Sequence, residues 1–544
     1  MSEKFDYIII GSGFGGSVSA LRLSEKGYKV LVIEKGKWFK SEDFPDDNRQ
    51  LKKWLWEPKL GFKGFFKMTF LRHVTVLSGV GVGGGSLTYA NTLPVPKKEF
   101  FTSGNWAGLA NWEQELKPFY PVAYRMLGAA ENTKLGDGDL ALKEVAREIG
   151  KEDEFHPTKV AVYFGEPGKT VKDPYFGGKG PERTGCIHCG QCMTGCKYNA
   201  KNTLDKNYLY LAQQLGAEII AETEVKDVLP LDGLTGKDGY RVITRSTDGT
   251  KLKQEFQSSG IVFAGGVMGT IPLLLKLKEK SLPQLSDTIG HSVRTNNEAL
   301  ISVTSFDRKP EKDYTTGLAI GSIVHTDKDS HLEPCRYGKG SGFFRFLGLP
   351  LAHGSSTLVR LLKTIPLAIR GFANHIRIPF MRDFSSRTTV LLFMQTLDST
   401  IRFVSNGFGG IKSKVDPGNQ KPTSQIPRAK ELSEIFEKAV NGKSYTLALE
   451  TLLGSPTTAH ILGGAVMGSS PEEGVIDRDN RVFNYENMLI CDGSMISANP
   501  GVNPSLSITA ISERAMAKIP PKNQKEFHAI GFDEKIEQPD AVTT

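Results

Sequence analysis

Three glycines near the start of the chain have the spacing that lets a backbone wrap around a dinucleotide phosphate. The run from Gly11 to Gly16 has the pattern G-x-G-x-x-G and lies between two apolar segments, 7–10 and 28–33, with Glu34 directly after the second. The first glycine allows a tight turn, the second lets the backbone approach a pyrophosphate, and the third lets a helix pack closely on the strand. Glu34 is placed to accept hydrogen bonds from an adenosine ribose. The pattern predicts a strand–helix–strand unit with the phosphates at a helix N-terminus.

A second glycine-rich loop favours FAD over NAD as this dinucleotide. Residues 78–87 contain five glycines and two serines, among them Gly81, Gly84, Gly85 and Ser86, and a further apolar run at 260–264 ends in Gly265. A nicotinamide cofactor needs one phosphate cradle, whereas a second loop suits a longer and permanently held ligand; the alternative is a flexible surface loop. The run that ends at Gly265 is expected to return the chain to the nucleotide-binding sheet.

The C-terminal part of the chain combines a strand, a carboxylate and a helix start. A buried strand is predicted at 489–491, followed by Asp492-Gly-Ser. Pro504 fits the first turn of an amphipathic helix over 505–519, where its missing N–H costs nothing. The start of this helix directs N–H groups and a positive dipole at whatever precedes it, which in a flavoenzyme would stabilise negative charge on the reduced ring. Upstream, His460 stands beside small residues that leave room for a ligand.

These motifs occur in one order over nearly the whole chain and resemble the glucose–methanol–choline (GMC) flavin oxidoreductases, most closely their cholesterol oxidase branch. The resemblance includes Leu-Gly-Gly at 462–464, Gly-Val-Asn-Pro at 501–504, and the segments 202–209 and 505–514. Residues 87–91 depart from the pattern of the branch. The predicted cofactor-binding residues are Gly11, Gly13, Phe14, Gly16, Glu34, Gly81, Gly84, Gly85, Ser86, Val225, Gly265, Asp492, Gly493, Asn503 and Pro504.

The resemblance implies an alcohol oxidation in which two side chains contact the substrate. His460 matches the active-site histidine of the family, which orients or deprotonates the substrate hydroxyl while hydride leaves for flavin N5. Asn503 matches the asparagine of the family that contacts the substrate oxygen and the flavin. The same roles follow from the chemistry, because alcohol oxidation needs a proton acceptor with a pKa near neutrality and a neutral polar group that fixes the oxygen. The alternative for His460 is an ordinary core histidine.

Glu333 is a third catalytic candidate. It falls about where cholesterol oxidases place a glutamate base that helps to isomerise the steroid double bond, and the alternative is a surface carboxylate. If Glu333 is this base, burial beside a steroid should raise its pKa, because desolvation disfavours the charged form.

Four of the six cysteines form one short run with the spacing C-x2-C-x2-C-x3-C, which bacterial ferredoxins use to ligate iron–sulfur clusters. A cluster would let the reduced flavin pass on single electrons, which favours a dehydrogenase over an oxidase. A single cluster would use all four thiolates, or three of them with Cys335, Cys491 or no other cysteine. A zinc site and a redox-active or vestigial thiol group are the alternatives. The run, which would be the metal site, comprises Cys186, Cys189, Cys192 and Cys196.

Composition and charge restrict the class of protein. The chain has 544 residues, and 68 Lys and Arg against 60 Asp and Glu give a net charge of +8, too small a surplus to indicate nucleic-acid binding. With 39% hydrophobic and 24% charged residues, a disordered, collagen-like or disulfide-knot protein is excluded. The chain shows neither a cleaved signal peptide nor an apolar run of about 18 residues that could span a bilayer. We therefore expect a soluble, cytoplasmic protein.

Residues 340–382 mix cationic and apolar side chains and contain no Asp or Glu. Prolines divide this segment into pieces too short to span a bilayer. Such a mixture suits an anionic membrane surface, so peripheral contact with the inner membrane face is one expectation. A lid of the substrate domain, with its apolar side over the active site, is the alternative and is compatible with the first.

We expect an α/β (α+β) fold in which a Rossmann-like FAD-binding domain, made of discontinuous segments, is joined to a mixed-sheet substrate-binding domain. Residues 521–544 are polar and are expected to form a loosely held tail. The predicted FAD-binding segments are 1–95, 200–305 and 455–520, and the predicted substrate-domain segments are 96–199, with the cysteine run 186–196, and 306–454.

Together these features predict an FAD-dependent enzyme that oxidises the CH–OH group of a hydrophobic alcohol, either a 3β-hydroxysteroid or a long-chain alcohol. The expected electron acceptor is O2, a redox protein or a quinone, and no nucleic-acid partner is expected. A GMC-type sugar or polyol dehydrogenase is the rival within enzymes, and the apolar segment 340–382 argues against it. A non-catalytic flavin and iron–sulfur subunit is the remaining alternative, against which His460 and Asn503 argue together.

Overall fold

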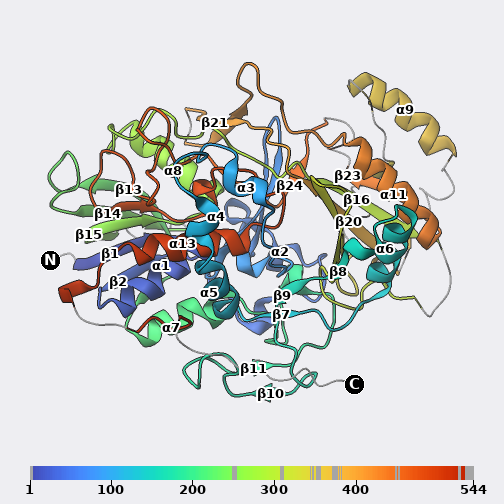
Figure 1. Ribbon diagram of the computed structural model, residues 1–544, viewed down its shortest axis with the longest axis horizontal. Helices are drawn as coiled ribbons and strands as arrows, with labels where there is room; N and C mark the ends of the chain where they lie inside the picture. Colours follow the sequence, from blue (N-terminus) through green and yellow to red (C-terminus); the bar gives the residue numbers. More distant parts are fainter. Residues whose placement is uncertain are drawn as a thin grey trace.

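Two large sheets form the two halves of the molecule (Figure 1). The strands of the first sheet lie on the left of Figure 1 and those of the second on the right, and segments from both ends of the chain meet between them. The computed structural model describes residues 4–247, 254–306, 312–342, 345, 348–350, 354, 357–370, 378, 380–381, 383–407, 409–447, 450, 454–524 and 528–532.

The first sheet has a parallel centre and an antiparallel edge. Its strands are β1 (Lys4–Ile10), β2 (Val30–Ile33), β12 (Glu218–Ile220), β13 (Thr223–Pro230), β14 (Tyr240–Ser246), β15 (Gln254–Phe263) and β25 (Met488–Ile490). The order is β12–β2–β1–β15–β14–β13, with β25 beside β15. All pairs are parallel except β13 with β14 and β14 with β15. The associated helices are α1 (Phe14–Glu25), α7 (Tyr208–Gln214), α8 (Val267–Lys278) and α13 (Ser505–Ala517).

The predicted strand–helix–strand unit at the N-terminus is confirmed, as β1, α1 and β2. The residues of β1 after Asp6 are buried, which is typical of a parallel strand covered on both faces. Gly11 has a φ of +108°, a conformation that side chains other than glycine rarely adopt. A Cβ atom on Gly16 would lie 2.1 Å from the Gly11 carbonyl oxygen. These two glycines therefore allow α1 to start directly against the end of β1.

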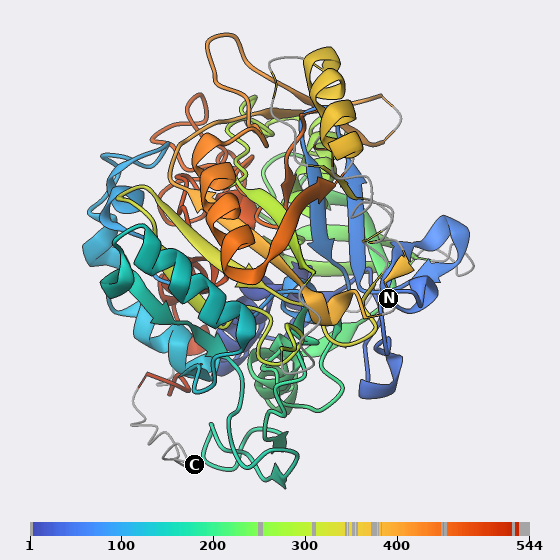
Figure 2. The ribbon, with the colours of Figure 1, turned by 90° about the vertical axis from the view of Figure 1, so that its right-hand side faces the viewer.

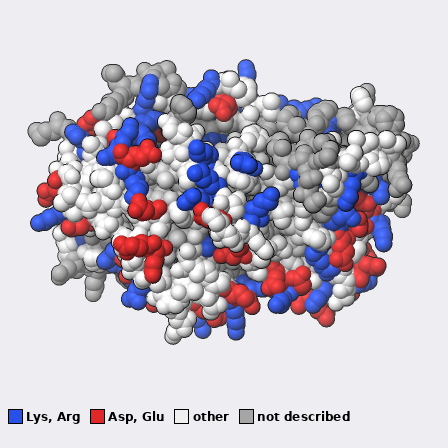
Figure 3. Space-filling model, turned by 90° about the horizontal axis from the view of Figure 1, so that it is seen from above, with Lys and Arg blue, Asp and Glu red and all other residues white. Residues whose placement is uncertain are grey.

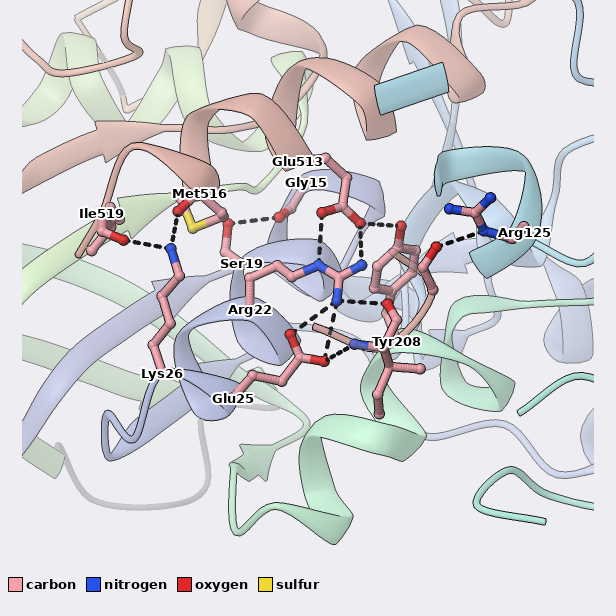
Figure 4. A network of polar contacts seen from close by, with 12 residues as sticks. Gly15, Ser19, Arg22, Glu25, Lys26, Arg125, Tyr208, Glu513, Met516 and Ile519 are labelled. Atoms are coloured by element: carbon pink, nitrogen blue, oxygen red, sulfur yellow. Dashed lines mark hydrogen bonds and ion pairs between the residues drawn. The ribbon is translucent and has the colours of Figure 1, made fainter. Parts of the chain in front are cut away.

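A buried ionic network joins α1 to α7 and α13 (Figure 4). Arg22 of α1 donates to both carboxylate oxygens of Glu513, at 2.7 and 2.8 Å, and pairs with Glu25 at 2.9 Å. Tyr208 of α7 donates to Glu513 at 2.6 Å, and Lys26 donates to carbonyl oxygens at the end of α13. Removal of one partner would leave the others buried and unpaired, so this network fixes α13, and with it the site at the start of that helix.

The second sheet is antiparallel and is covered on one face by two helices. Its strands are β8 (Phe155–Pro157), β16 (Ala299–Ser305), β17 (Ser322–His325), β18 (Ser330–Cys335), β19 (Gly348–Pro350), β20 (Thr388–Gln395) and β23 (Gly442–Leu447), in the order β19–β23–β16–β20–β18–β17–β8. The covering helices are α6 (Asp137–Glu148) and α11 (Pro427–Val440) (Figure 2). Strand β16 belongs to this second sheet, although residues 299–305 were predicted as the end of the FAD-binding segment 200–305. The predicted α/β fold class is confirmed, although every strand pair of the second sheet is antiparallel where a mixed sheet was predicted.

Alternation along these strands decides which side chains face the inside of the molecule. Ile301 of β16 and Leu391 of β20 pack in the layer beneath α6 and α11, whereas their neighbours Leu300 and Leu392 line a central cavity. Successive side chains of a strand point to opposite faces. Glu333 of β18 lies opposite Leu392 in the register of β18 and β20, so it belongs to the cavity face.

A smaller sheet carries the chain to His460. It consists of β5 (Phe66–Phe70), β6 (Thr75–Gly79) and β24 (Thr457–Thr458), and β24 pairs in parallel with β6. The remaining elements are α2 (Leu51–Trp54), β3 (Trp56–Glu57), β4 (Phe62–Lys63), α3 (Lys98–Thr102), α4 (Trp112–Leu116), α5 (Phe119–Met126), β7 (Ala129–Glu131), β9 (Lys159–Ala161), β10 (Thr170–Val171), β11 (Arg183–Thr184), α9 (Thr357–Arg370), β21 (Arg402–Ser405) and β22 (Ile411–Lys414).

Helix α9 projects from the second half of the molecule (Figures 1 and 2). Leu362, Ile365 and Ile369 are 60%, 54% and 68% exposed, and their spacing puts them on one face of the helix. Figure 3 shows the molecule from above, which is the side on which α9 lies in Figure 1. Lys and Arg side chains gather near the middle of this face. Other parts of the predicted segment 340–382 lie outside the described residues, as does most of the predicted tail 521–544. Within the described ranges, no helix has both the length and the apolar character needed to cross a membrane.

Candidate active site

A cavity of about 900 Å³ runs between the two sheets, from the N-terminal glycine fingerprint to the start of α13. Gly16, Gly81, Ser86 and Glu333 were predicted as site residues but do not line this cavity. The predicted residues that do line it are Gly11, Gly13, Phe14, Glu34, Gly84, Gly85, Val225, Gly265, His460, Asp492, Gly493, Asn503 and Pro504. Residues from distant parts of the sequence thus meet around one elongated space.

Glu34 joins the two glycine loops at one end of the cavity. Its carboxylate accepts hydrogen bonds from Ser12 N at 3.2 Å, Ser12 Oγ at 2.8 Å, Gly36 N at 2.9 Å and Gly81 N at 3.3 Å. A carboxylate can accept about four hydrogen bonds, and these four donors occupy all of its acceptor sites. Glu34 therefore holds the loops in place, and the contact with a ribose stays a prediction.

The start of α1 faces the second glycine loop across the cavity. The helix begins at Phe14 without a side-chain cap and without an acidic residue in its first turn, so its N–H groups can bind an anion. A Cβ atom on Gly84 would lie 2.7 Å from the Gly13 Cα atom, which shows how closely the loops approach. Ser86 stabilises the second loop, because its hydroxyl donates to the Gly83 carbonyl at 2.7 Å and accepts from Leu204 N at 3.1 Å.

Asp492 connects the end of β25 to the start of α8. Its carboxylate accepts hydrogen bonds from Gly266 N at 2.9 Å, Thr270 Oγ1 at 2.5 Å and Ser494 N at 2.8 Å. Burial raises the pKa of this carboxyl group, although the hydrogen bonds oppose the shift. Asp492 thereby fixes Gly265 and Gly493, which both line the cavity.

His460 forms a hydrogen-bonded pair with a buried glutamate. The Nδ1 atom of His460 lies 3.0 Å from Oε1 of Glu298, which also accepts from the Thr458 hydroxyl. Burial alone would lower the pKa of His460, but the charge and hydrogen bond of Glu298, together with the charge of Glu333, raise it overall. With Nδ1 donating to Glu298, the neutral ring keeps Nε2 available as a proton acceptor. His460 lines the cavity, and its catalytic role stays a prediction.

Sequence reasoning missed Glu298. It follows Asn296 and Asn297, whose φ angles of 54° and 44° place both in the left-handed region. Asparagine tolerates this conformation better than most residues, so two consecutive asparagines before an acid were the available signal of a tight turn. The turn is what delivers the Glu298 side chain to His460 and to the cavity.

Asn503 lies at the start of α13, opposite Glu333. Its Nδ2 atom donates to Glu333 Oε2 at 3.4 Å, and its Oδ1 atom is buried without a hydrogen-bond partner among the described residues. Glu333 is fully buried, and its Oε1 atom lies 3.5 Å from His331 Nε2. The alternative of a surface carboxylate at Glu333 is therefore excluded, while its role as a base stays a prediction.

Comparisons with known proteins agree with this geometry. Residues 181–278 and 417–512 match two family models that are both described as GMC oxidoreductase, and residues 9–49 match one described as an NAD(P)-binding Rossmann-like domain. The chain is 44% identical to a cholesterol oxidase of Acinetobacter baumannii over 96% of each chain. It is 43% identical to a cholesterol oxidase of Mycobacterium tuberculosis over 97% of this chain and 93% of that one. The chain belongs to the GMC oxidoreductase family.

Within the GMC oxidoreductases the chain belongs to the cholesterol oxidase branch, as the sequence motifs predicted. It is an FAD-dependent enzyme that oxidises alcohols. The fold is shared more widely: the solved structure of pyridoxine 4-oxidase from Mesorbium loti has a TM-score of 0.60 at 14% identity, covering 94% of this chain and 98% of that one.

The cavity of this GMC oxidoreductase fits FAD. One end has two facing glycine loops and a helix N-terminus, which suit the pyrophosphate. The other end has the start of α13 and the unpartnered Oδ1 atom of Asn503, a buried polar atom that needs a partner from a bound molecule. The second sheet adds an apolar wall at this end, formed by Leu300, Ile320, Val390 and Leu392.

The four cysteines of the predicted metal site lie together elsewhere in this enzyme. They line a second, small cavity and form no disulfide. Of the other cysteines, Cys335 lines the large cavity and Cys491 is buried after β25, so neither joins the group. In the described part of the chain, no three His, Cys, Asp or Glu side chains are arranged so that they could hold a single metal ion.

Proposed function

We propose that this enzyme oxidises the 3β-hydroxyl group of a sterol, with His460 as the proton acceptor and Asn503 as the group that fixes the hydroxyl oxygen. The observation that carries the proposal is the position of this polar pair at the edge of an apolar wall that includes Leu300 and Leu392. Such a wall suits the ring system of a steroid and leaves the hydroxyls of a sugar without partners. The likeness to proteins named cholesterol oxidase supports the same substrate class.

Bound FAD would take the hydride of the carbinol carbon at N5 and pass its electrons on to O2, to a quinone or to a redox protein, in the last case through an iron–sulfur cluster. His460 would take the hydroxyl proton at Nε2, while Glu298 stabilises the resulting imidazolium through Nδ1. Asn503 would hold the oxygen as negative charge grows on it, and its place before α13 adds the favourable end of a helix dipole.

We further propose that Glu333 moves a proton on the steroid ring after oxidation. It is buried on the cavity face of the second sheet and is joined to Asn503 at 3.4 Å. A carboxylate in this position can take a proton from a carbon next to the new ketone and return it elsewhere, which shifts the double bond.

We also propose peripheral contact with a lipid surface through α9. Leu362, Ile365 and Ile369 form an exposed apolar stripe on this helix, and the segment around it carries no Asp or Glu from 340 to 382. An amphipathic helix with cationic neighbours lies in the interface of an anionic membrane, where sterols and long-chain alcohols reside.

Anaerobic reduction of the bound FAD tests the substrate class. The holoenzyme is mixed under nitrogen with cholesterol, decanol or glucose, and the loss of flavin absorbance is followed. We expect cholesterol to reduce the flavin fastest. Faster reduction by decanol would assign a long-chain alcohol, and faster reduction by glucose would assign a sugar. Reduction by dithionite but by none of the three would favour an electron-transfer subunit and contradict the proposal.

A further inference from the structure

We propose that Cys186, Cys189, Cys192 and Cys196 bind one iron–sulfur cluster that lies between the flavin cavity and the protein surface. The binding site itself is independent of the substrate, whereas the source of the electrons rests on the proposed function. The alternatives at the same place are a zinc ion and a group of free thiols.

The loop that carries these cysteines is bent by left-handed residues. Gly190 and Gly195 have φ angles of +69° and +97°, and His188 and Asn199 both have φ angles of 56°. This conformation costs energy in residues other than glycine, and such positions concentrate at functional sites. The four thiols converge on one small cavity as a result.

The sulfur atom of Cys186 accepts a hydrogen bond from the backbone. Neutral thiols are weak acceptors, so aligned N–H groups are of most value to thiolates and to a cluster, whose reduction potential depends on hydrogen bonds to sulfur. The donor is His188 N, which lies 3.4 Å from this sulfur.

Two buried basic side chains lie beside this group of thiols. Lys201 and Arg183 are each 1% exposed, and among the described residues neither forms an ion pair with a carboxylate. The Lys201 ammonium donates to the carbonyl oxygens of Cys192 at 2.8 Å and Leu87 at 3.0 Å. A buried charge is costly unless a counter-charge compensates it. A cluster held by four thiolates carries net negative charge and would provide that compensation.

The proposed cluster site borders the flavin cavity on one side and solvent on the other. Met193, next to Cys192 in the same turn, lines the flavin cavity, and so does Asn91, which approaches the Cys192 thiol. On the outer side, Ile187 and Tyr198 line the small cavity and are 40% and 43% exposed. The cysteines therefore adjoin the flavin cavity through Met193 and Asn91, and all four are themselves partly exposed.

This position suits the removal of electrons one at a time. Oxidation of an alcohol to a ketone yields two electrons and two protons. The two electrons would leave the flavin in two single-electron steps, each of which reduces the cluster before an external one-electron acceptor, such as a small redox protein, reoxidises it. The two protons go to solvent.

Reconstitution of the holoenzyme tests the site. The full-length protein is purified under nitrogen and incubated with ferrous iron and sulfide, and then iron, sulfide, zinc and FAD are measured per chain. We expect iron and acid-labile sulfide in similar amounts, with a paramagnetic signal after reduction by dithionite. Cys192→Ala and Cys196→Ala should lose the iron and keep FAD, whereas Ile187→Ala, in the same loop but without a ligand atom, should keep both. Zinc without sulfide, or four titratable thiols and no iron, would overturn the proposal.

Two further experiments test the site if a cysteine variant does not fold. One replaces Lys201, and the other reduces the enzyme with its alcohol substrate. Lys201→Met should shift the midpoint potential of the cluster to more negative values, because a buried cation favours the added electron; an unchanged potential would count against the site. Under nitrogen, the alcohol that bleaches FAD should also produce the signal of the reduced cluster. Bleaching without that signal would overturn the electron route. If dithionite reduces the cluster but no alcohol reduces the FAD, the cluster site is supported and the proposed function is contradicted.

Discussion

Oε1 of Glu298 lies 3.0 Å from Nδ1 of His460, although the two residues are 162 positions apart in the chain. The side chain of Glu298 is fully buried and that of His460 is 13% exposed. The pair therefore behaves as one unit in which the carboxylate orients the ring and favours its protonated form. Glu298 acts on the reaction through His460 and is a positioning residue.

Glu298→Gln is expected to move the acid limb of the kcat/KM profile to lower pH. His460 serves as a base only above its pKa, so activity falls as the pH drops through that raised value. Loss of the carboxylate lowers the pKa of His460, so the ring stays unprotonated to lower pH, while kcat falls because the imidazolium is less stabilised. Steady-state rates between pH 5 and 9 measure both effects.

Glu450 provides a matched control for this substitution. It is also buried, but it accepts hydrogen bonds from Thr446 and Thr457 and does not contact His460. Glu450→Gln should leave the acid limb where it is. An equal shift in both variants would show that the effect of Glu298 is not specific to the pair.

Glu333→Gln is expected to separate the two proposed steps on a sterol. Oxidation of the hydroxyl should continue, because His460 keeps its partner Glu298, whereas the double bond should no longer migrate. Chromatography of the products would then show the unconjugated ketone in place of the conjugated one. A proportional loss of both activities would contradict a role of Glu333 as a base.

Replacement of Leu362, Ile365 and Ile369 by serine is expected to weaken binding to anionic vesicles. Burial of such a side chain contributes at least about 1.5 kcal/mol, and about 1.4 kcal/mol corresponds to a factor of ten, so we expect a loss of at least about ten-fold. Sedimentation with phosphatidylglycerol vesicles measures the binding, and activity on sterol in detergent should stay unchanged. Leu234→Ser, at a residue 58% exposed elsewhere, should bind as the unchanged protein does.

Arg22→Met is expected to lower the free energy of unfolding by about 3–5 kcal/mol, because it leaves the carboxylates of Glu25 and Glu513 buried without their cation. Urea unfolding followed by fluorescence measures the loss. Arg49→Met removes a pair in which the arginine is 66% exposed, and it should cost about 1 kcal/mol or less. Similar losses in both variants would show that the network around α1 contributes no more than a surface pair.

Several parts of the site could be predicted from the sequence, because their chemistry depends on residues that are close together in the chain. The glycine fingerprint needs six consecutive residues and a strand on either side, and the structure contains that unit as β1, α1 and β2. The same holds for Asp492-Gly-Ser before the helix that starts at Ser505. These patterns follow from the conformations that glycine and proline allow.

The tertiary structure decided the partners of these residues. Glu298 reaches His460, Glu333 faces Asn503 rather than solvent, and Lys201 donates to the Leu87 carbonyl oxygen only because distant segments pack together. A glutamate in a sequence looks the same whether its strand turns it toward solvent or toward a cavity, and the register of β18 against β20 makes that choice. Spacing along the chain determines which chemical groups are present in each motif. Packing between the sheets determines which of these groups come into contact, and how burial and neighbouring charges shift their pKa values.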